Sequence, residues 1–429
     1  MKIVIAGAGF GGLRLARKLN GKAGFEVVLI DRFNYHQFQP LFYQVATAGL
    51  DASNISFPLR KVFQNSRNVK VRLASILELK PDQNLVITDQ EKISYDVLVL
   101  ALGADTNFFG NEKLAANAFP MKSTVEALNL RHSLLQNFEH AHTIQDAEEL
   151  QKQMNIVVVG GGPTGVEVSG ALAEMKRDVL PKDFPELDFR KMNIYLLEGA
   201  GKTLGTMSER SSAQSKKYLE KLGVTVMLNT LVKDYDGEKI SLVDGKTINT
   251  RTVVWAAGIK GNIPIGLDKA LIVRGNRIKT DRQSRILGSN NIYVIGDLAY
   301  METPKYPAGH PQVASVAIQQ AELIYSNLKM QQKKRGEYKW VEFEYRDKGS
   351  MATVGRNLAV VDIPRPRLHF GGLFAWLIWM SLHLMLILGV KNRLFVFMNW
   401  MYNYFTYDQN LRLIFKVDRG KQPAKPPVI

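Results

Sequence analysis

Short apolar runs that close on glycine recur along the chain and are typical of buried parallel strands. The first run, residues 3–6, leads into Gly7, Gly9 and Gly12 and then into the helical pattern GLRLARKLN. The next run, EVVLI, ends in Asp31. Glycines at this spacing allow a tight turn and close approach of a pyrophosphate, and an acid after the second strand can accept hydrogen bonds from ribose hydroxyls. The pattern favours a dinucleotide-binding βαβ unit over an ordinary glycine-rich turn.

The same pattern occurs a second time. NIVVVGGGPTGVEVSGALAE repeats the strand, the glycines Gly160, Gly162 and Gly165, and the helix, while MNIYLLE supplies a strand that ends in Glu198. The segment RDVLPKDFPELDF lengthens this unit beyond the usual spacing and is interpreted as an inserted loop. Two dinucleotide folds predict two dinucleotides, and the commonest such pair is a flavin with a nicotinamide.

Three further apolar runs extend this picture. YDVLVLALGA and TVVWAAGI close on Gly103 and Gly258, where flavoproteins with two dinucleotides pass between domains, and NIYVIGDLA ends in Gly296 and Asp297. Asp297 is placed to bind ribityl hydroxyls, with a helix from about Pro311 aimed at the flavin ring. The alternative is that Asp297 only caps a helix.

Composition narrows the class of protein. The chain has 429 residues, which predicts two or three domains, and a net charge of +16, which favours anionic partners without choosing among them. It has no cysteine, which excludes disulfides, thiolate metal sites and a catalytic thiol. The seven histidines show no metal-ligand spacing, so we expect no metal. The N-terminus runs directly into a strand, which predicts a cytoplasmic protein.

Over nearly its whole length the chain resembles the type II NADH:quinone oxidoreductases, single-subunit NADH dehydrogenases that do not pump protons. The glycine motifs are shared with many reductases. More specific motifs are HQFQPLFYQVATAGL, VASVAIQQA and FGGLFAWLIWMSLHLMLILGVKNR. The resemblance implies non-covalent FAD in the first domain, NADH in the second and a quinone that enters from the membrane.

The resemblance also implies site residues. Gln319 and Gln320 are expected near the quinone, although Ser315 stands where the family has another glutamine, and the alternative is that the glutamines only bridge helices. Glu167 is expected beside flavin and nicotinamide in hydride transfer or proton delivery, with helix capping as its alternative. Cofactor contacts are expected from Gly7, Gly9, Phe10, Gly11, Gly12, Asp31, Arg32, Gln44, Ile76, Ala101, Gly103, Gly160, Gly162, Pro163, Thr164, Gly165, Glu198, Ala257, Gly258, Gly296 and Asp297.

Residues 370–390 contain no acid, lysine or arginine and are long enough to span a bilayer. Basic residues flank the stretch: Arg365, Arg367, Lys391, Arg393, Arg412, Lys416, Arg419, Lys421 and Lys425. Since a single crossing would leave seven of them on the far side, we expect a helix that lies in the interface of an anionic membrane, with a buried core helix as the alternative.

We therefore predict an α/β protein with two Rossmann-like domains and a membrane-associating C-terminal segment. Residues 1–110 and 266–328 are assigned to FAD, residues 111–265 to NADH and residues 329–429 to the membrane. The expected enzyme reduces ubiquinone or menaquinone in the respiratory chain, at the cytoplasmic face of the inner membrane, and binds no nucleic acid. A homodimer is left open. The alternatives are a soluble NAD(P)H-dependent reductase of a protein carrier and a membrane-bound redox sensor.

Overall fold

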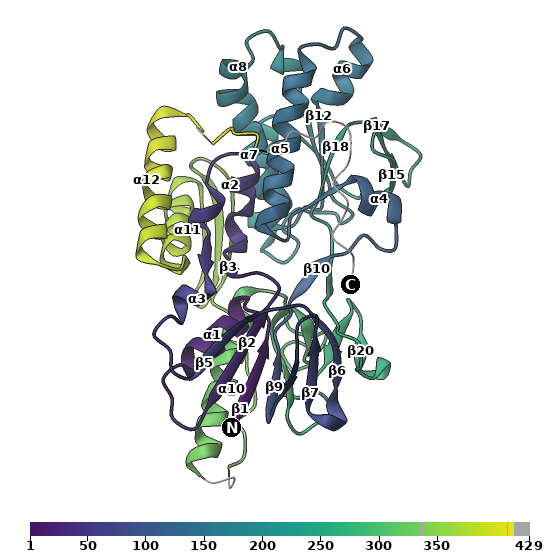
Figure 1. Ribbon diagram of the computed structural model, residues 1–429. Coiled ribbons are helices and arrows are strands. Elements are labelled where there is room, and N and C mark those ends of the chain that lie inside the picture. The colour runs from purple at the N-terminus through teal and green to yellow at the C-terminus, as the bar shows by residue number, and fades with distance from the viewer. Residues whose placement is uncertain (335–337, 410, 416–429) are drawn as a thin grey trace.

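Two parallel five-stranded sheets form the centres of two lobes in the structure, a computed structural model that describes residues 1–334, 338–409 and 411–415 (Figure 1). In each sheet the strand before a glycine loop is central and pairs in parallel with the strands on both sides. The first sheet has the order β22 (Ile292–Val294), β9 (Val97–Leu100), β1 (Lys2–Ala6), β2 (Glu26–Asp31), β5 (Val69–Leu73), and the second has β11 (Phe119–Pro120), β18 (Thr252–Trp255), β12 (Asn155–Val159), β13 (Asn193–Leu197), β14 (Val224–Met227). The predicted pair of Rossmann-like folds is confirmed.

Both faces of the first sheet are covered, which is why its strands read as continuous apolar runs. On one face, Ile3 and Ile5 pack with the helices α1 (Phe10–Leu19) and α10 (Ala314–Lys333). On the other face, Val4 packs against a small antiparallel sheet. That sheet consists of β6 (Ile76–Lys80), β7 (Leu85–Thr88) and β8 (Lys92–Ser94).

The second lobe repeats this layering. Its sheet is covered by helices on one face and by an antiparallel sheet on the other, which consists of β15 (Val232–Tyr235), β16 (Lys239–Leu242) and β17 (Thr247–Asn249). The helices are α5 (Thr124–Ala141), α6 (Ala147–Met154), α7 (Pro163–Glu174), α8 (Leu180–Asp183) and α9 (Glu209–Lys221). The expected inserted loop is largely helical, because α7 continues through a π-helical turn (Met175–Val179) whose Val179 is buried.

Two strands carry the chain between the lobes. β10 (Ala104–Thr106) pairs antiparallel with β19 (Ile259–Gly261), and Figure 1 shows β10 between the two sheets. Gly103 and Gly258 stand directly before them in the left-handed region, with φ of 66° and 77°. The predicted crossing points are thus turns that favour glycine.

The apolar stretch at residues 370–390 is not one helix. It contains the end of β26 (Arg367–Gly371), the helix α11 (Gly372–Leu386), a break and the first residue of α12 (Val390–Thr406). The prediction of a single helix is wrong because Gly389, with φ of 84°, turns the chain where a Cβ would lie 2.4 Å from Phe57. Among the described residues no helix is long and apolar enough to cross a membrane.

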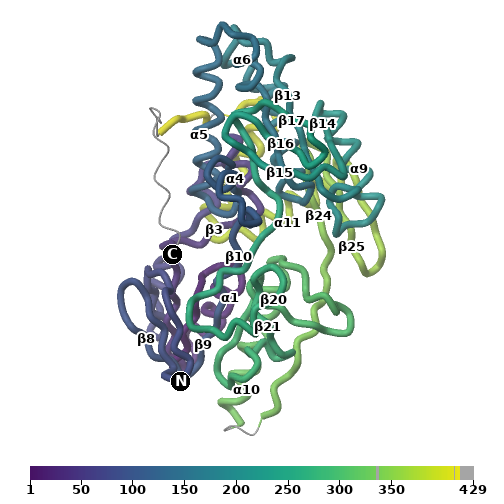
Figure 2. Tube along the Cα trace, turned by 90° about the vertical axis from the view of Figure 1, so that its right-hand side faces the viewer, coloured from purple at the N-terminus to yellow at the C-terminus, as the bar shows by residue number. Residues whose placement is uncertain are grey.

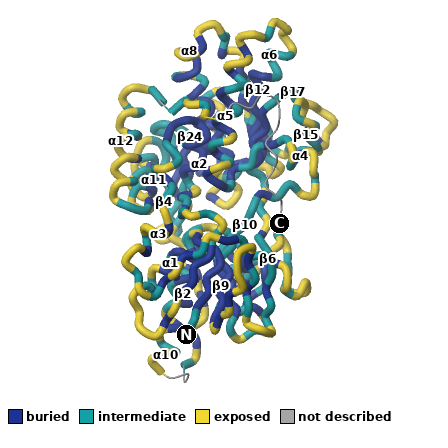
Figure 3. Tube along the Cα trace, viewed as in Figure 1, coloured by how far each residue is buried: buried dark blue, intermediate teal, exposed yellow. Residues whose placement is uncertain are grey.

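Each of the two C-terminal helices has a buried side and an apolar exposed side. In α11 the residues Ala375, Trp379 and His383, four apart, are buried. The outer sides of α11 and α12 appear exposed at the left of Figure 3. Large apolar side chains gather there, among them Leu373, Phe374, Leu377, Met385, Leu386, Leu394, Phe395, Met398 and Phe405. Of the flanking basic residues, Lys416, Arg419, Lys421 and Lys425 lie outside the described residues.

The remaining elements are short connections. They are β3 (Tyr35–Gln37), η1 (Gln39–Leu41), α2 (Phe42–Ala46), η2 (Ala52–Asn54), β4 (Ser56–Pro58), α3 (Leu59–Val62), η3 (Pro81–Gln83), α4 (Glu112–Asn117), η5 (Phe189–Lys191), η6 (Lys269–Leu271), β20 (Ile272–Val273), β21 (Arg277–Lys279), η7 (Gly296–Leu298) and β23 (Ala299–Tyr300).

A C-terminal sheet joins the helices α11 and α12 to the second lobe. It consists of β24 (Ser350–Gly355), β25 (Leu358–Pro364) and β26, and Figure 2 shows β24 and β25 beside α9 and α11. Its contact with α7 is very close, since a Cβ on Gly170 would lie 1.5 Å from the Val354 carbonyl oxygen. Glycine at this position therefore sets the separation between α7 and β24.

We predict that Gly170→Ala destabilises the protein. Alanine in place of a mid-helix glycine normally stabilises by about 0.5–1 kcal/mol. Here the methyl group forces two backbone segments apart, so we expect a net loss of about 1–3 kcal/mol in the free energy of unfolding. Denaturant unfolding followed by circular dichroism measures it. Gly205→Ala, at a glycine with open space and no left-handed φ, is the control and should change little. Equal stability of both variants would contradict the contact.

Candidate functional site

The first glycine loop is closed on one side and open on the other. Gly7 has φ of 101°, and a Cβ there would lie 2.3 Å from the Ala101 carbonyl oxygen. A Cβ on Gly12 would lie 1.8 Å from the carbonyl oxygen of Gly7, whereas Gly9 has no atom within 4 Å on that side. The loop therefore packs tightly on the sheet and leaves room at Gly9 for a ligand.

Asp31 is attached to this loop. Its carboxylate accepts hydrogen bonds from the backbone N–H of Ala8 at 2.6 Å and of Phe33 at 2.8 Å. Burial raises the pKa of Asp31, and the two N–H donors oppose that shift. The carboxylate is thus fixed at the end of β2, beside the open side of the loop, where the ribose of a dinucleotide binds in this fold.

The second loop has the same geometry. Gly160 has φ of 108°, and a Cβ on Gly165 would lie 1.8 Å from the carbonyl oxygen of Gly160. Gly162 faces open space. Glu198 accepts hydrogen bonds from the backbone N–H of Gly161 and, at 2.7 Å, of Ala200. Each loop therefore packs tightly against its sheet on one side, is open on the other and has a fixed carboxylate beside it. This arrangement fits one dinucleotide in each lobe.

The other predicted cofactor residues border these loops or the crossing strands. Phe10 and Gly11 begin α1, Pro163 and Thr164 begin α7, Ile76 begins β6, and Ala101 and Ala257 follow the strands β9 and β18. Arg32 follows Asp31, with its guanidinium 3.9 Å from the Asp105 carboxylate.

Gly296 and Asp297 lie at the end of β22, next to α10. Gly296 has φ of 72°, and its backbone N–H donates to the side-chain oxygen of Gln320 at 2.8 Å. Burial raises the pKa of Asp297, while Lys122 and Arg277 lower it. α10 begins at Ala314, three residues after the expected start. The loop and the helix end are thus joined through a buried glutamine.

Gln319 has different partners from Gln320. Its side-chain amide donates to the carbonyl of Arg346 and accepts from the N–H of the same residue, both at 3.0 Å. Ser315, at the position of the family's other glutamine, is hydrogen-bonded to the Tyr345 hydroxyl at 2.8 Å. Both side chains connect α10 to the segment that leads to β24.

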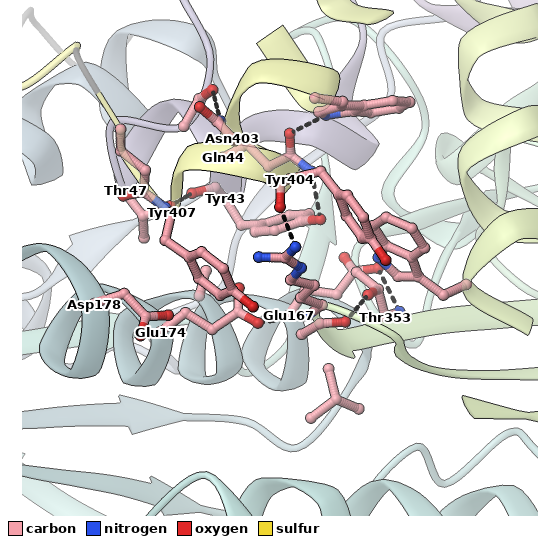
Figure 4. Close-up of a pocket in the computed structure, with 18 of the residues that line it drawn as sticks. Tyr43, Gln44, Thr47, Glu167, Glu174, Asp178, Thr353, Asn403, Tyr404 and Tyr407 are labelled. Carbon is pink, nitrogen blue, oxygen red and sulfur yellow. Dashed lines mark hydrogen bonds between the residues drawn. The ribbon is translucent and has the colours of Figure 1, made fainter. Parts of the chain in front are cut away.

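A cavity of about 140 Å³ lies between α2, α7, β24, α11 and α12 (Figure 4). Neither Gln319 nor Gln320 lines it, but Glu167 and Gln44 do. The Gln44 amide donates to the Tyr43 hydroxyl at 2.7 Å and accepts from the Trp400 indole N–H at 2.7 Å. Gln44, expected at a cofactor, therefore connects α2 with α12 at this cavity. The other lining groups that matter for chemistry are Tyr43, Glu174, Asp178, Arg356, Trp379, Tyr404 and Tyr407.

Glu167 is held as a neutral acid in this cavity. It is 8% exposed, and the backbone N–H of Thr353 in β24 points to its carboxyl group at 3.4 Å. Burial raises its pKa to about 8, against the weaker opposing effects of the Thr353 N–H and the Trp379 indole. At neutral pH the side chain carries a proton that it can donate.

Arg356 lies in the turn that follows β24 and also lines the cavity. Its guanidinium is 3.9 Å from the centre of the Tyr404 ring and 3.8 Å from that of Tyr407, so cation–π attraction holds it between them. Its backbone N–H donates to Glu174. The structure thus brings a cation, acids and aromatic rings to one cavity.

Sequence reasoning missed much of this cavity. Tyr43, Glu174, Arg356 and Trp379 come from four separate elements, and only the folded chain brings them together. One signal was present: Glu174 follows Glu167 by seven residues, which places both on one face of a helix.

Comparison with known proteins agrees with this architecture. Residues 1–321 match the family described as pyridine nucleotide-disulphide oxidoreductase, and residues 348–407 match the NDH2 C-terminal domain. The type II NADH:quinone oxidoreductase Ndh of Mycobacterium tuberculosis is 36% identical over 415 residues, covering 93% of this chain and 87% of the relative. The type II NADH:quinone oxidoreductase of Staphylococcus aureus is 30% identical over 370 residues, covering 82% and 87%.

Solved structures share the fold at lower identity. NDH2 of Plasmodium falciparum in complex with NADH has a TM-score of 0.87 at 22% identity and covers 97% of this chain and 99% of its own. The sulfide:quinone oxidoreductase of Aquifex aeolicus has a TM-score of 0.69 at 19% identity, covering 94% and 95%. Both glycine loops, the C-terminal domain and the sequence relatives lead to one conclusion: this chain belongs to the type II NADH:quinone oxidoreductases.

Proposed function

We propose that this enzyme reduces a membrane quinone in the cavity between α2, α7, β24, α11 and α12. The family activity is transfer of hydride from NADH to FAD and of two electrons on to a quinone, in the respiratory chain and without proton pumping. Bound FAD supplies the hydride and electron chemistry. The observation that supports the quinone site is the position of the cavity, which is walled by the two helices whose outer sides are apolar and exposed.

The two glycine loops are proposed to bind the two dinucleotides. FAD is assigned to residues 1–110 and 266–328, where Gly9 has open space and Asp31 is anchored, and NADH to residues 111–265, where Gly162 and Glu198 correspond to them. The backbone N–H groups at the start of α1 and α7 face the phosphates in this arrangement.

The cavity can position a quinone through polar groups on apolar walls. Glu167 holds a proton, and Arg356 and Trp379 bring N–H groups to the cavity. That Gln319 and Gln320 lie next to the quinone stays a prediction. Their hydrogen bonds support a second role, in which Gln320 positions the Gly296 loop and Gln319 positions the chain that leads to β24.

The exposed sides of α11 and α12 are proposed to attach the enzyme to an anionic membrane at its cytoplasmic face. A quinone with a long apolar tail is dissolved in the bilayer, so the cavity must open next to it. Lys391 and Arg393, at the start of α12, add positive charge beside the apolar side chains. Ubiquinone and menaquinone both fit this chemistry, and a homodimer is compatible with it.

Glu198 predicts strong selectivity for NADH. Its anchored carboxylate would repel a 2′-phosphate, so we expect kcat/KM for NADH to exceed that for NADPH by about a hundredfold or more. Glu198→Gln should narrow this ratio, and Glu209→Gln, at an exposed glutamate nearby, should not. Steady-state kinetics with both cofactors measure it. Comparable kcat/KM values in the wild type would refute the assignment.

Filling the cavity tests the quinone site. Ala171 lines the cavity from α7, and Ala171→Leu is expected to lower kcat/KM for quinone by about tenfold or more, because the added methyl groups occupy ligand volume. NADH should still bleach the flavin at nearly the wild-type rate in anaerobic mixing. Ala213→Leu, at an exposed position on α9, is the control. Unchanged quinone kinetics in Ala171→Leu would place the quinone elsewhere.

Three substitutions on the outer sides of α11 and α12 test membrane attachment. Phe374, Met385 and Phe405 are each at least 60% exposed. Replacing all three by glutamine should weaken binding to anionic vesicles by about a hundredfold or more, since each apolar side chain contributes ~1.5–3 kcal/mol when buried. Flotation with vesicles measures it. The control replaces Val243, Ile265 and Leu287, which are exposed elsewhere. Equal flotation of both triple variants would contradict the proposal.

A further inference from the structure

The overall reaction needs a proton that NADH does not carry. NADH loses a hydride, which is two electrons and one proton, and the quinone gains two electrons and two protons to become a quinol. One proton per turnover must therefore come from water. We propose that Glu174 relays this proton from solvent into the quinone cavity, along the face of α7 that also carries Glu167.

Three acids lie in a row along this face. Glu167 and Glu174 are seven residues apart on α7, which corresponds to two turns and a rise of about 10.5 Å. Asp178 follows on the π-helical turn, where it forms an ion pair with the partly exposed Arg177. All three line the cavity, and Figure 4 shows them on one side of the helix. The row leads from the partly exposed ion pair to the buried Glu167.

Glu174 occupies the middle of this row. Its carboxyl group accepts a hydrogen bond from the backbone N–H of Arg356. Burial raises its pKa, while Arg356 and Arg177 lower it and Asp178 raises it further. Burial raises the pKa of the Tyr43 phenol on α2, and the charges of Glu167 and Glu174 add to that shift. Tyr407 contributes to the raised pKa of Arg177. Glu174 is therefore protonated over a wider pH range than an exposed glutamate.

Tyr43 lines the same cavity as the two glutamates, and both carboxyl groups lie close enough to affect its pKa. Its hydroxyl oxygen accepts a hydrogen bond from Gln44, which leaves the O–H hydrogen available for donation. Burial raises the pKa of Tyr43, and a negative charge on either glutamate would raise it further, so Tyr43 stays protonated near neutral pH and acts by passing a proton on. In the relay, Glu174 gives its proton to the Tyr43 oxygen while the Tyr43 O–H proton goes to the quinone oxygen. Water then reprotonates Glu174 by way of the Asp178 end.

A second observation indicates that the cavity holds a ligand rather than only an acidic cluster. The Trp379 indole interacts with the Glu167 carboxyl group, but one guanidinium nitrogen of Arg356 is buried in the cavity without a hydrogen-bond partner among the described residues. Buried donors of this kind usually have an acceptor. A carbonyl oxygen of a quinone is an acceptor of the right kind.

The proposal rests on the quinone site proposed above, and its test compares two variants. Glu174→Gln keeps the shape but cannot transfer a proton, so quinone turnover should fall about tenfold or more while NADH bleaches the flavin within about twofold of the wild-type rate. A small weak acid such as acetic acid should restore part of the lost turnover in proportion to its concentration. Glu174→Asp, which keeps a titratable carboxyl group, should recover more activity than Glu174→Gln.

A readout independent of turnover is the infrared band of a protonated carboxyl group. The wild-type protein at neutral pH should show this band, and Glu174→Gln should lose part of its amplitude. The control is Glu220→Gln, at an exposed glutamate paired with Lys216 on α9, which should change neither measurement.

Two outcomes overturn the relay. One is wild-type quinone turnover in Glu174→Gln. The other is a loss that acetic acid does not rescue and that Glu174→Asp shares in full, since that result indicates a structural role. Ala171→Leu separates failure of the relay from failure of the quinone site. If Ala171→Leu lowers kcat/KM for quinone and Glu174→Gln does not, the quinone site is supported and the relay is refuted.

Discussion

The close contact between α7 and β24 is the constraint on which the site depends. Gly170 allows the helix backbone to touch the Val354 carbonyl, and Thr353 on the same strand points its N–H to Glu167. The first turn of α7 borders the second glycine loop, and its later turns wall the cavity. One helix therefore links the loop proposed to bind NADH to the cavity proposed to bind quinone, and a shift of α7 would change both.

The C-terminal helices α11 and α12 carry apolar residues both on their buried sides and on their exposed sides. Trp379 and Trp400 face inward, where they pack into the same core as the second lobe, while Phe374 and Phe405 face outward. A helix that is apolar all round is usually buried on every side. In the proposed arrangement a lipid-soluble substrate accounts for the second apolar surface, because the wall of the quinone cavity is then also the surface nearest the bilayer.

Sequence patterns predicted the two sheets and both glycine loops because these depend on local rules. Gly7, Gly12, Gly160 and Gly165 are required by clashes with residues a few positions away or on the adjoining strand, and such requirements recur at fixed spacing. The cavity could not be predicted in this way. Arg356 is held by Tyr404 and Tyr407, about fifty positions further along the chain, and no local pattern encodes that contact. The single helix expected at residues 370–390 failed for a related reason, since hydropathy does not register a left-handed glycine at Gly389.

The fold alone does not select this chemistry. The sulfide:quinone oxidoreductase of Aquifex aeolicus shares the architecture, and the broader family is described by pyridine nucleotide and disulphide chemistry. This chain has no cysteine, so it cannot carry out redox chemistry through a thiol of its own. On α7 this chain instead carries two acids, Glu167 and Glu174, whose pKa values burial raises. Electrons can pass directly between cofactor and quinone, but protons need donors at contact distance, and in the proposed relay the buried carboxyl groups of α7 supply them.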